Sequence, residues 1–277
     1  MTIELIQTED NSSEKFKYIE EQSYVDPSEE IEYPPVAVSM GEYVYQNKTF
    51  PIQLGTYGNF SFIQAPPKSK KTFFVSILAS AYLGNTTRFT GDLKGHRGDK
   101  CLVHFDTEQG RFDAQKVFRR TLNMADTDNT CYHTFALRPH SYKERLEFIE
   151  WYLYENSESV GMVIIDGIAD LCVDVNDIKE ANELVQRIMR WTEDLGIHIV
   201  VVIHSNFGSD KPTGHLGSFL EKKTETQIQL EVDENNHNLV AVRCKRSRSY
   251  PFEEFYFEVN KDGIPEVIDG VTKMLDY

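Results

Sequence analysis

Short apolar segments alternate with segments of helical periodicity between residues 59 and 205. The apolar segments are nearly continuous, which is typical of strands that are buried on both faces of a sheet. The predicted strands are 59–65, 101–108, 131–137, 160–167 and 197–205. A helical pattern follows each of the first four, and the helix after residue 71 is apolar all round and ends at Gly84. This order predicts an α/β fold with a mainly parallel sheet and helices on both faces.

The two flanks of this region follow other patterns. Residues 36–56 hold short β-branched and aromatic runs broken by glycine and proline, which predict strands near a sheet edge. Residues 85–100 show no periodicity and are expected to form a loop. After residue 224 strands and turns continue without helices, which predicts an antiparallel extension of the same sheet.

Acidic residues dominate the first 34 positions. Ten acids stand there against Lys15 and Lys17, so this segment contributes −8 of the net charge of −15. It is poor in aliphatic residues and ends at Pro34-Pro35, which is typical of a solvated, partly disordered tail. The alternative is an arm that links subunits, built on EKFKYIEEQSYV. The expected organisation is therefore a tail or arm over 1–35 and one domain over 36–277.

Charge, cysteine usage and hydropathy restrict the class of protein. A net charge of −15 argues against a broad basic surface for duplex DNA or anionic membranes. The cysteines are widely spaced and have no C-x-x-C pattern, which favours reduced thiols in a cytosolic protein over zinc ligands. Neither a signal peptide nor an apolar run of about 18 residues is present, so we expect a cytoplasmic protein without a membrane contact.

A lysine-rich loop, QAPPKSKKTFF at residues 64–74, separates the first of these strands from its helix. Aligned with the phosphate-loop pattern G-x-x-x-x-G-K-[ST], it has Ala65 and Lys70 at the two glycine positions, followed by Lys71 and Thr72 intact. In such loops backbone N–H groups at a helix N-terminus bind phosphate, the lysine neutralises the terminal phosphates and the hydroxyl reaches the metal. The loop predicts binding of ATP with Mg²⁺.

Polar residues also follow the later strands. Asp106 and Glu108 follow the second, Asp166 ends the fourth and His204 ends the fifth. Ligands of open parallel sheets gather at the carboxyl ends of the strands, so these side chains are expected to converge. There Asp166 is expected to hold Mg²⁺ through water. Glu108 would orient or deprotonate the attacking water, and His204 would sense the γ-phosphate.

The segments APPKSKKT, HFDTEQ, VIIDGIADL, VVVIHS and GHLGSFLEKKTE resemble the RecA-like P-loop ATPases. Within them the similarity is to the RepA and KaiC/DnaB-like branch, AAA-type ATPases of bacterial plasmids, phages and mobile elements, and it covers about residues 36–260. The resemblance implies a RecA-like core in which Glu108 is the catalytic base, Asp166 binds magnesium and His204 couples hydrolysis to a DNA-facing loop. Lys71 joins Glu108 and His204 as an expected catalytic residue.

Proteins of this kind often form hexameric rings in which a basic finger reaches the γ-phosphate of a neighbour. CKRSRSYP resembles that K-x-R finger, with Arg246 and Arg248 in register. The alternative is a set of exposed cations on an edge strand. The resemblance therefore implies a homo-oligomer such as a hexameric ring.

The loop lacks both glycines of the pattern. Ala65 is a mild change, and the side chain of Lys70 can point outward at the start of the helix, while Lys68 and Ser69 supply additional donors. The expected metal ligands are Thr72 and Asp166. The expected nucleotide-binding residues are Ala65, Pro66, Pro67, Lys68, Ser69, Lys70, Lys71, Thr72, Arg246 and Arg248.

Taken together, these motifs predict an ATP-binding and ATP-hydrolysing motor or accessory factor in DNA replication or mobilisation. Residues 206–218, with three glycines and Lys211, could contact single-stranded DNA, as in a helicase. An alternative is a nucleotide-gated assembly module with little or no hydrolysis, because both loop glycines are missing. The long antiparallel C-terminal run disfavours a third alternative, a small-molecule kinase of the P-loop type.

Overall fold

The computed structural model describes the chain except residues 1–2, 85–87, 129, 207–208, 210 and 269–277. It divides into two compact units, Met1–Tyr33 and Pro34–Tyr277. The first unit consists of helix α1 (Ile3–Ser23) and an irregular stretch. Composition favoured a partly disordered tail or an arm here, and the structure describes a helix over most of this acidic segment. No described helix is both long enough and apolar enough to cross a membrane.

A large sheet forms the centre of the second unit, and its described strands lie in the order β12-β11-β10-β9-β3-β8-β7-β5-β6. Strands β9, β3, β8, β7, β5 and β6 run parallel, whereas β10, β11 and β12 add antiparallel pairs at one edge. This confirms the predicted mainly parallel sheet and its antiparallel C-terminal extension. The bounds are β3 Phe60–Ala65, β5 Cys101–Asp106, β6 Tyr132–Ala136, β7 Val160–Asp166, β8 His198–His204, β9 Thr226–Val232, β10 Leu239–Ser247, β11 Phe255–Val259 and β12 Pro265–Ile268.

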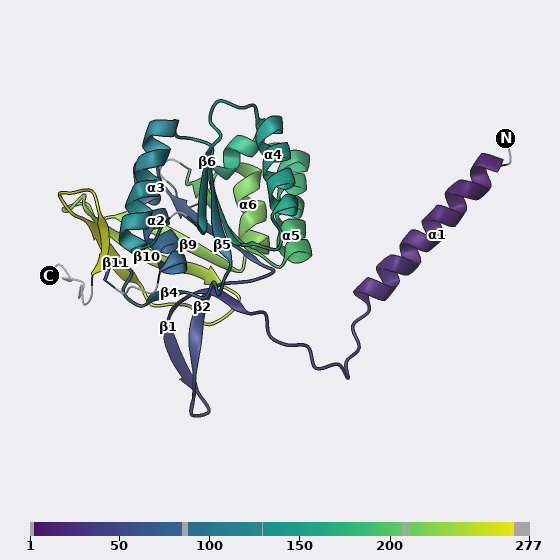
Figure 1. Cartoon of the computed structure of the whole chain (residues 1–277), viewed down its shortest axis with the longest axis horizontal. Helices are drawn as coiled ribbons and strands as arrows, with labels where there is room; N and C mark the ends of the chain where they lie inside the picture. The colour runs from purple at the N-terminus through teal and green to yellow at the C-terminus, as the bar shows by residue number, and fades with distance from the viewer. Residues whose placement is uncertain (1–2, 85–87, 129, 207–208, 210, 269–277) are drawn as a thin grey trace. The chain divides into compact units, whose positions relative to one another are not determined.

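Helices cover both faces of this sheet, as Figure 1 shows. Alternate residues of a strand point to opposite faces. In β7, Met162 and Ile164 join the apolar cluster under α2 and α3, whereas Val163 and Ile165 join the cluster under α4, α5 and α6. The helices are α2 Lys71–Leu83, α3 Arg111–Ala125, α4 Tyr142–Glu155, the short 3-10 helix η1 Ile168–Leu171, α5 Ile178–Leu195 and α6 Gly214–Lys223. The apolar core therefore has two layers, one on each face of the large sheet.

A capping box stands at the start of α4. The Ser141 hydroxyl accepts a hydrogen bond from the Glu144 backbone N–H at 3.4 Å, and the Glu144 carboxylate accepts one from the Ser141 N–H at 2.8 Å. The two side chains thereby satisfy two backbone donors that the helix itself leaves unpaired.

Residues 36–56 form strands as predicted, β1 (Val36–Tyr45) and β2 (Lys48–Thr56), and these lie in a separate small sheet ordered β2-β1-β4 with β2 at its edge. The prediction of a loop over 85–100 was wrong in part. Strand β4 (Leu93–Gly95) lies inside the expected loop 85–100 and pairs with β1 through Val38, Ser39 and Met40. Three residues are too few to show a strand period, so only the tertiary pairing defines this strand.

Candidate nucleotide-binding site

The ends of four parallel strands bring the expected site residues to one edge of the sheet. Asp106, at the end of β5, lies in register beside Asp166, at the end of β7. Ala65, at the end of β3, lies in register beside His204, at the end of β8. The lysine-rich loop leaves the same edge and enters α2. Segments far apart in the sequence therefore share one site, in the place that the strand-end argument predicts.

The backbone of the loop takes the left-handed conformation twice, at Lys68 (φ 64°) and at Lys70 (φ 60°, ψ 26°). The left-handed conformation costs an L-residue other than glycine roughly 1–2 kcal/mol, because its Cβ atom is too close to the backbone. Glycine has no Cβ atom and is therefore common there. Ala65 is fully buried within β3 and has no such conformation. The backbone thus needs glycine-like freedom at Lys68 and Lys70, and not at the first glycine position of the aligned pattern.

The side chain of Lys70 turns to the neighbouring surface. Its ammonium lies 3.5 Å from the Asn238 side-chain oxygen and 5.6 Å from the centre of the Phe73 ring. The loop closes on itself because the Ser69 N–H donates to the Pro66 carbonyl at 3.3 Å. The first turn of a helix leaves backbone N–H groups without partners in the helix. A left-handed residue followed by these donors is the type of backbone that binds anions.

Lys71 points into the site from the first turn of α2. Its ammonium donates to the Pro66 carbonyl oxygen at 3.2 Å and contacts Nδ1 of His204 at 3.0 Å. Only 8% of Lys71 is exposed, and this burial lowers the pKa of its ammonium, against the opposing effect of the Glu108 and Asp166 carboxylates. The lysine is therefore held in place by contacts within the chain.

His204 connects Lys71 to Glu108. The Lys71 ammonium can only donate, so Nδ1 of the neutral imidazole accepts, and Nε2–H donates to Glu108 Oε1 at 3.2 Å. This hydrogen bond is the largest cause of a lowered pKa at Glu108, and the charge of Lys71 acts in the same direction. The His204 and Glu108 side chains are 36% and 40% exposed. The result is a solvent-facing carboxylate that stays ionised beside the loop.

Asp166 and Asp106 are almost fully buried behind this chain of contacts, at 3% and 0% exposure. Burial raises the pKa of Asp166 to about 8, and the charges of Asp106 and Glu108 act in the same direction. Asp106 Oδ1 accepts hydrogen bonds from the backbone N–H groups of Glu108 at 3.1 Å and Gln109 at 2.8 Å. Asp106 therefore fixes the turn that presents Glu108. Sequence reasoning noted Asp106 without giving it a role.

Further contacts that the sequence did not predict hold the elements of the site together. Arg120 of α3 donates to the Thr72 carbonyl oxygen at 3.0 Å and to the Ser76 hydroxyl at 3.0 Å, and its guanidinium lies over the Phe73 ring. The Thr107 hydroxyl lies 2.9 Å from the Asp166 carbonyl oxygen. These contacts join the first turn of α2 to α3 and the end of β5 to the end of β7.

Arg246 and Arg248 lie at the other end of the sheet. Arg246 is opposite Gln227, at the start of β9, and the Arg248 side chain lies 3.5 Å from the Asn59 side-chain oxygen, just before β3 begins. The loop leaves β3 at its far end, about 17 Å away at the usual rise of a strand. Neither arginine contacts the expected site residues in the described chain, so any role at a nucleotide requires the site of another subunit.

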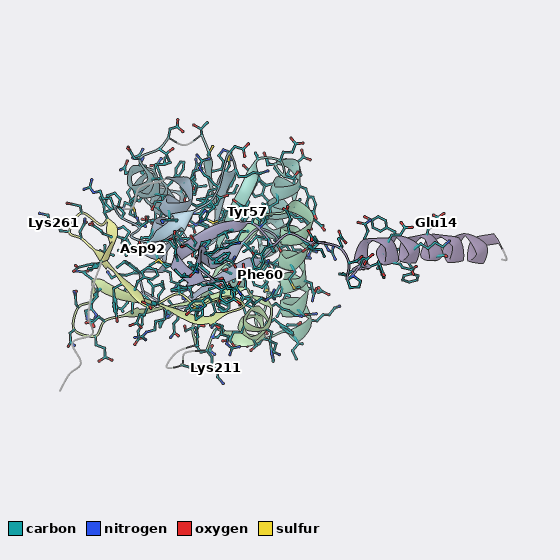
Figure 2. The ribbon with its side chains drawn as sticks, turned by 90° about the horizontal axis from the view of Figure 1, so that it is seen from below. Glu14, Tyr57, Phe60, Asp92, Lys211 and Lys261 are labelled. Carbon is teal, nitrogen blue, oxygen red and sulfur yellow. The ribbon has the colours of Figure 1, made fainter. Side chains whose placement is uncertain are left out.

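The expected DNA-facing loop, residues 206–218, lies only partly within the described residues, because 207–208 and 210 are outside them. Helix α6 begins at Gly214, so the second part of the segment is helical and not a loop. Ser205 and Pro212 pair as an isolated bridge, and Lys211 is exposed on the surface (Figure 2).

Comparison with known proteins bears on the family and the fold of the chain. The model of a family described as AAA domain matches residues 53–210, which is more than half of the chain. The crystal structure of the RadB recombinase has a similar fold, with a TM-score of 0.54 and 14% sequence identity over 77% of this chain and 92% of that one. No curated protein matches the sequence. The two similarities support a RecA-like P-loop ATPase fold, and the RepA and KaiC/DnaB-like branch stays a prediction.

Proposed function

We propose, since the chain belongs to the AAA domain family, that it is a RecA-like ATPase that binds ATP with Mg²⁺ at the loop of residues 65–72 and hydrolyses it. The observation that carries the proposal is the chain of contacts from Lys71 through His204 to Glu108. This chain of contacts joins Lys71, which is expected at the phosphates, to Glu108, which is expected at the attacking water. General bases act within about one hydrogen bond of the proton that they accept, and Glu108 is exposed and ionised there.

The donors available near the loop fit a magnesium ion. Mg²⁺ prefers hard oxygen ligands and retains several waters, and Thr72 offers a hydroxyl while Asp166 offers a carboxylate. Asp166 ends β7 at the same edge of the sheet from which the loop leaves β3, so its carboxylate would reach a cation there. When bound, the ion would offset the negative charge that develops on the phosphates. Lys71 and the backbone donors of the loop would orient the same phosphates.

On this proposal, His204 responds to nucleotide binding. A γ-phosphate oxygen beside Lys71 would compete with His204 for one of the three ammonium donors. Loss of the Lys71 contact changes the orientation of the imidazole, and the other ring nitrogen contacts Glu108. On this proposal, occupation of the phosphate site and the position of the base are coupled through one side chain. The chain continues from His204 through Ser205 to the expected DNA-facing loop, where Lys211 is exposed.

We further propose that the protein acts as an oligomer on single-stranded DNA in replication or mobilisation. The location of Arg246 and Arg248, far from the loop of their own subunit, supports a role at a neighbour's nucleotide.

The nucleotide-gated assembly module is the second candidate, and one observation favours it. Lys68 and Lys70 hold a left-handed backbone that glycine would adopt freely, so the loop departs there from a glycine-bearing phosphate loop.

The deciding experiment measures ATP turnover by the full chain with Mg²⁺, with and without single-stranded DNA, together with ATP affinity by calorimetry. A DNA-dependent ATPase predicts turnover that rises when single-stranded DNA is added. ATP binding with assembly, but without turnover in either condition, identifies the assembly module. Absence of ATP binding removes both candidates. The Lys71→Ala variant is the comparison, since it removes the ammonium together with its contacts to Pro66 and His204.

A further inference from the structure

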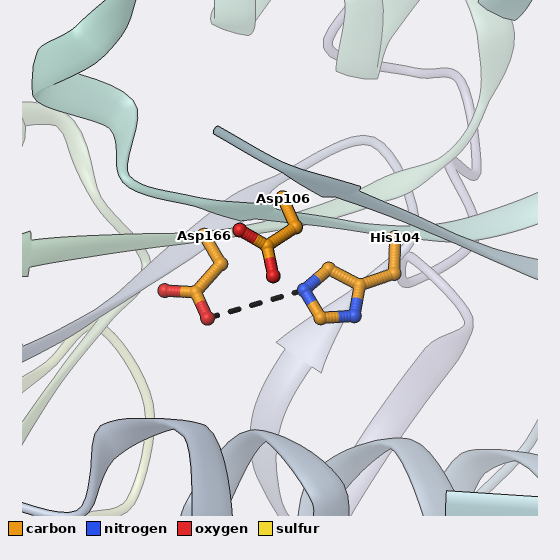
Figure 3. Close-up of side chains that lie close together, drawn as sticks. All are labelled: His104, Asp106 and Asp166. Atoms are coloured by element: carbon orange, nitrogen blue, oxygen red, sulfur yellow. Dashed lines mark ion pairs between the residues drawn. The ribbon is translucent and has the colours of Figure 1, made fainter. Parts of the chain in front are cut away.

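Three buried side chains direct potential ligand atoms at one another behind the loop (Figure 3). His104 and Asp106 come from β5, two residues apart and therefore on one face of the strand, and Asp166 lies in register beside Asp106 on β7. His104 and Asp106 are 0% exposed and Asp166 is 3% exposed. His104 was not identified from the sequence, where it is one polar residue inside an apolar strand.

One atom of each side chain has no hydrogen-bond partner among the described residues: His104 Nε2, Asp106 Oδ2 and Asp166 Oδ2. The second polar atoms of His104 and Asp106 do have hydrogen-bond partners. Tyr132 contacts the second ring nitrogen of His104 at 3.2 Å, and two backbone N–H groups occupy the second oxygen of Asp106. Buried polar atoms nearly always have a partner, and buried carboxylates need a compensating charge. Three unpartnered atoms facing one another indicate a missing positive ligand.

We propose that His104, Asp106 and Asp166 form a binding site for a divalent first-row transition-metal ion of the Mn²⁺, Co²⁺ or Zn²⁺ type. One imidazole nitrogen and two carboxylate oxygens are donors that these ions accept, whereas Mg²⁺ prefers oxygen alone. Two carboxylates and a neutral imidazole also match the charge of a divalent cation. The site does not depend on ATP, and it uses two residues that the proposed magnesium site lacks.

The distances fit such an ion. All three ligand atoms lie within 4.8 Å of one another, and His104 Nε2 is 4.0 Å from Asp166 Oδ2. Ligands at about 2.1 Å from one ion lie at most about 4.2 Å apart, so small side-chain rotations would complete the site. The Tyr132 hydroxyl can accept from Nδ1–H of His104, which leaves the Nε2 lone pair free for a metal. Asp166 Oδ1 is not part of this group and remains available to a cation at the loop.

Binding of Co²⁺ to the full, untagged chain without nucleotide tests the proposal. The chain is unfolded and refolded with Co²⁺, so that entry into a buried site does not limit loading, and unbound ion is removed. We expect one Co²⁺ per chain by elemental analysis, with visible absorption bands that differ from those of hydrated Co²⁺. Mn²⁺ and Zn²⁺ should displace it, and Mg²⁺ at the same concentration should not. Less than stoichiometric Co²⁺, or equal displacement by Mg²⁺, would overturn the proposal.

Variants assign the bound ion to these residues. His104→Gln and Asp106→Asn each remove a ligand, and the asparagine keeps the oxygen that caps the turn at Glu108. Tyr132→Phe keeps all three ligands and removes the hydroxyl that contacts Nδ1 of His104. Loss of such an outer partner costs about 10–100-fold in metal affinity, so we expect Tyr132→Phe to weaken binding by this factor and the ligand variants to weaken it more.

His237→Gln is the matched control, because it makes the same substitution at an exposed histidine that is distant in sequence from the three proposed ligands. Circular dichroism checks that each variant folds. If His104→Gln or Asp106→Asn does not fold, Tyr132→Phe still decides the assignment. Equal Co²⁺ binding by Tyr132→Phe and by the control would place the ion elsewhere, for example on the half-buried thiols of Cys131 and Cys244, and would overturn the assignment. Because nucleotide is absent throughout, this outcome is independent of whether the chain hydrolyses ATP.

Discussion

Nε2 of His204 lies 3.2 Å from Oε1 of Glu108, while Nδ1 of the same ring lies 3.0 Å from the Lys71 ammonium. One imidazole thus touches both the residue expected at the phosphates and the residue expected at the water. The lowered pKa of Glu108 follows mainly from its hydrogen bond to His204. On the proposed function, the protonation state of the base depends on an intact contact with this histidine.

Glu108→Gln should reduce ATP turnover by about 10²-fold or more while ATP affinity stays nearly unchanged, because the amide cannot accept the proton of the attacking water. Steady-state turnover and calorimetric titration with ATP measure the two quantities separately. Glu147→Gln is the matched control, since Glu147 lies exposed on α4 and outside the site. Normal turnover in the Glu108 variant would exclude Glu108 as the base.

His204→Ala should move the acidic limb of the turnover–pH profile to higher pH. The contact with His204 lowers the pKa of Glu108, so removing it lets that pKa rise toward its ordinary value. The base is then protonated, and inactive, at pH values where it is ionised in the unmodified chain. The measurement is the pH dependence of kcat for both proteins. An acidic limb at the same pH would show that His204 does not control the charge of Glu108, even if the rate falls.

Asp166→Asn should change stability in a pH-dependent way. The pKa of Asp166 is about 8 in the folded chain against an ordinary value of 3.8, so the folded state retains a proton that the unfolded state loses between these values. The folded state binds more protons there, and stability falls as pH rises from about 4 to about 8. The neutral asparagine has no such dependence. The difference in unfolding free energy, measured with urea in metal-free buffer, should therefore increasingly favour the variant across this range.

The converging strand ends were predictable from the sequence, because a parallel sheet brings Glu108, Asp166 and His204 to one edge whatever the loop details are. Other features depend on three-dimensional context. His104 gives no local signal, since a single polar residue in a buried strand does not change the apolar pattern. The left-handed backbone of Lys68 and Lys70 was not predictable either, because the usual marker of that conformation is a glycine and the loop has none.

Replacing both Arg246 and Arg248 with Ala should abolish turnover in an assembled oligomer and leave ATP binding by isolated subunits nearly intact. Neither side chain contacts the loop of its own subunit in the described chain, so on the proposed function they act at a neighbour's nucleotide. Mixing this variant with Lys71→Ala provides the test, because each protein retains the part that the other lacks. Partial recovery of turnover is expected. If the two variants co-assemble and turnover stays absent, the arginines do not act across the interface.

Lys70→Gly should stabilise the fold by about 1 kcal/mol relative to Lys70→Ala. Both variants remove the same ammonium, but alanine keeps the Cβ atom that makes the left-handed backbone at φ 60° unfavourable. Urea unfolding of the two variants isolates the cost of this conformation from the loss of charge. Equal stabilities would mean that the loop relaxes without strain.

The same pair of variants shows what the glycine-free loop does to ATP. If Lys70 contributes a cation to the phosphates, both variants should bind ATP with similar or lower affinity, because one cation near a partly solvated anion is worth about 1 kcal/mol. We expect similar affinity for both variants and the unmodified chain, because the Lys70 ammonium lies beside the Asn238 side-chain oxygen and near the Phe73 ring. If its Cβ and backbone strain obstruct the phosphates, Lys70→Gly should bind ATP more tightly than both Lys70→Ala and the unmodified chain. Calorimetric titration at matched Mg²⁺ decides between these outcomes, and tighter binding by the glycine variant would favour the assembly module over the ATPase.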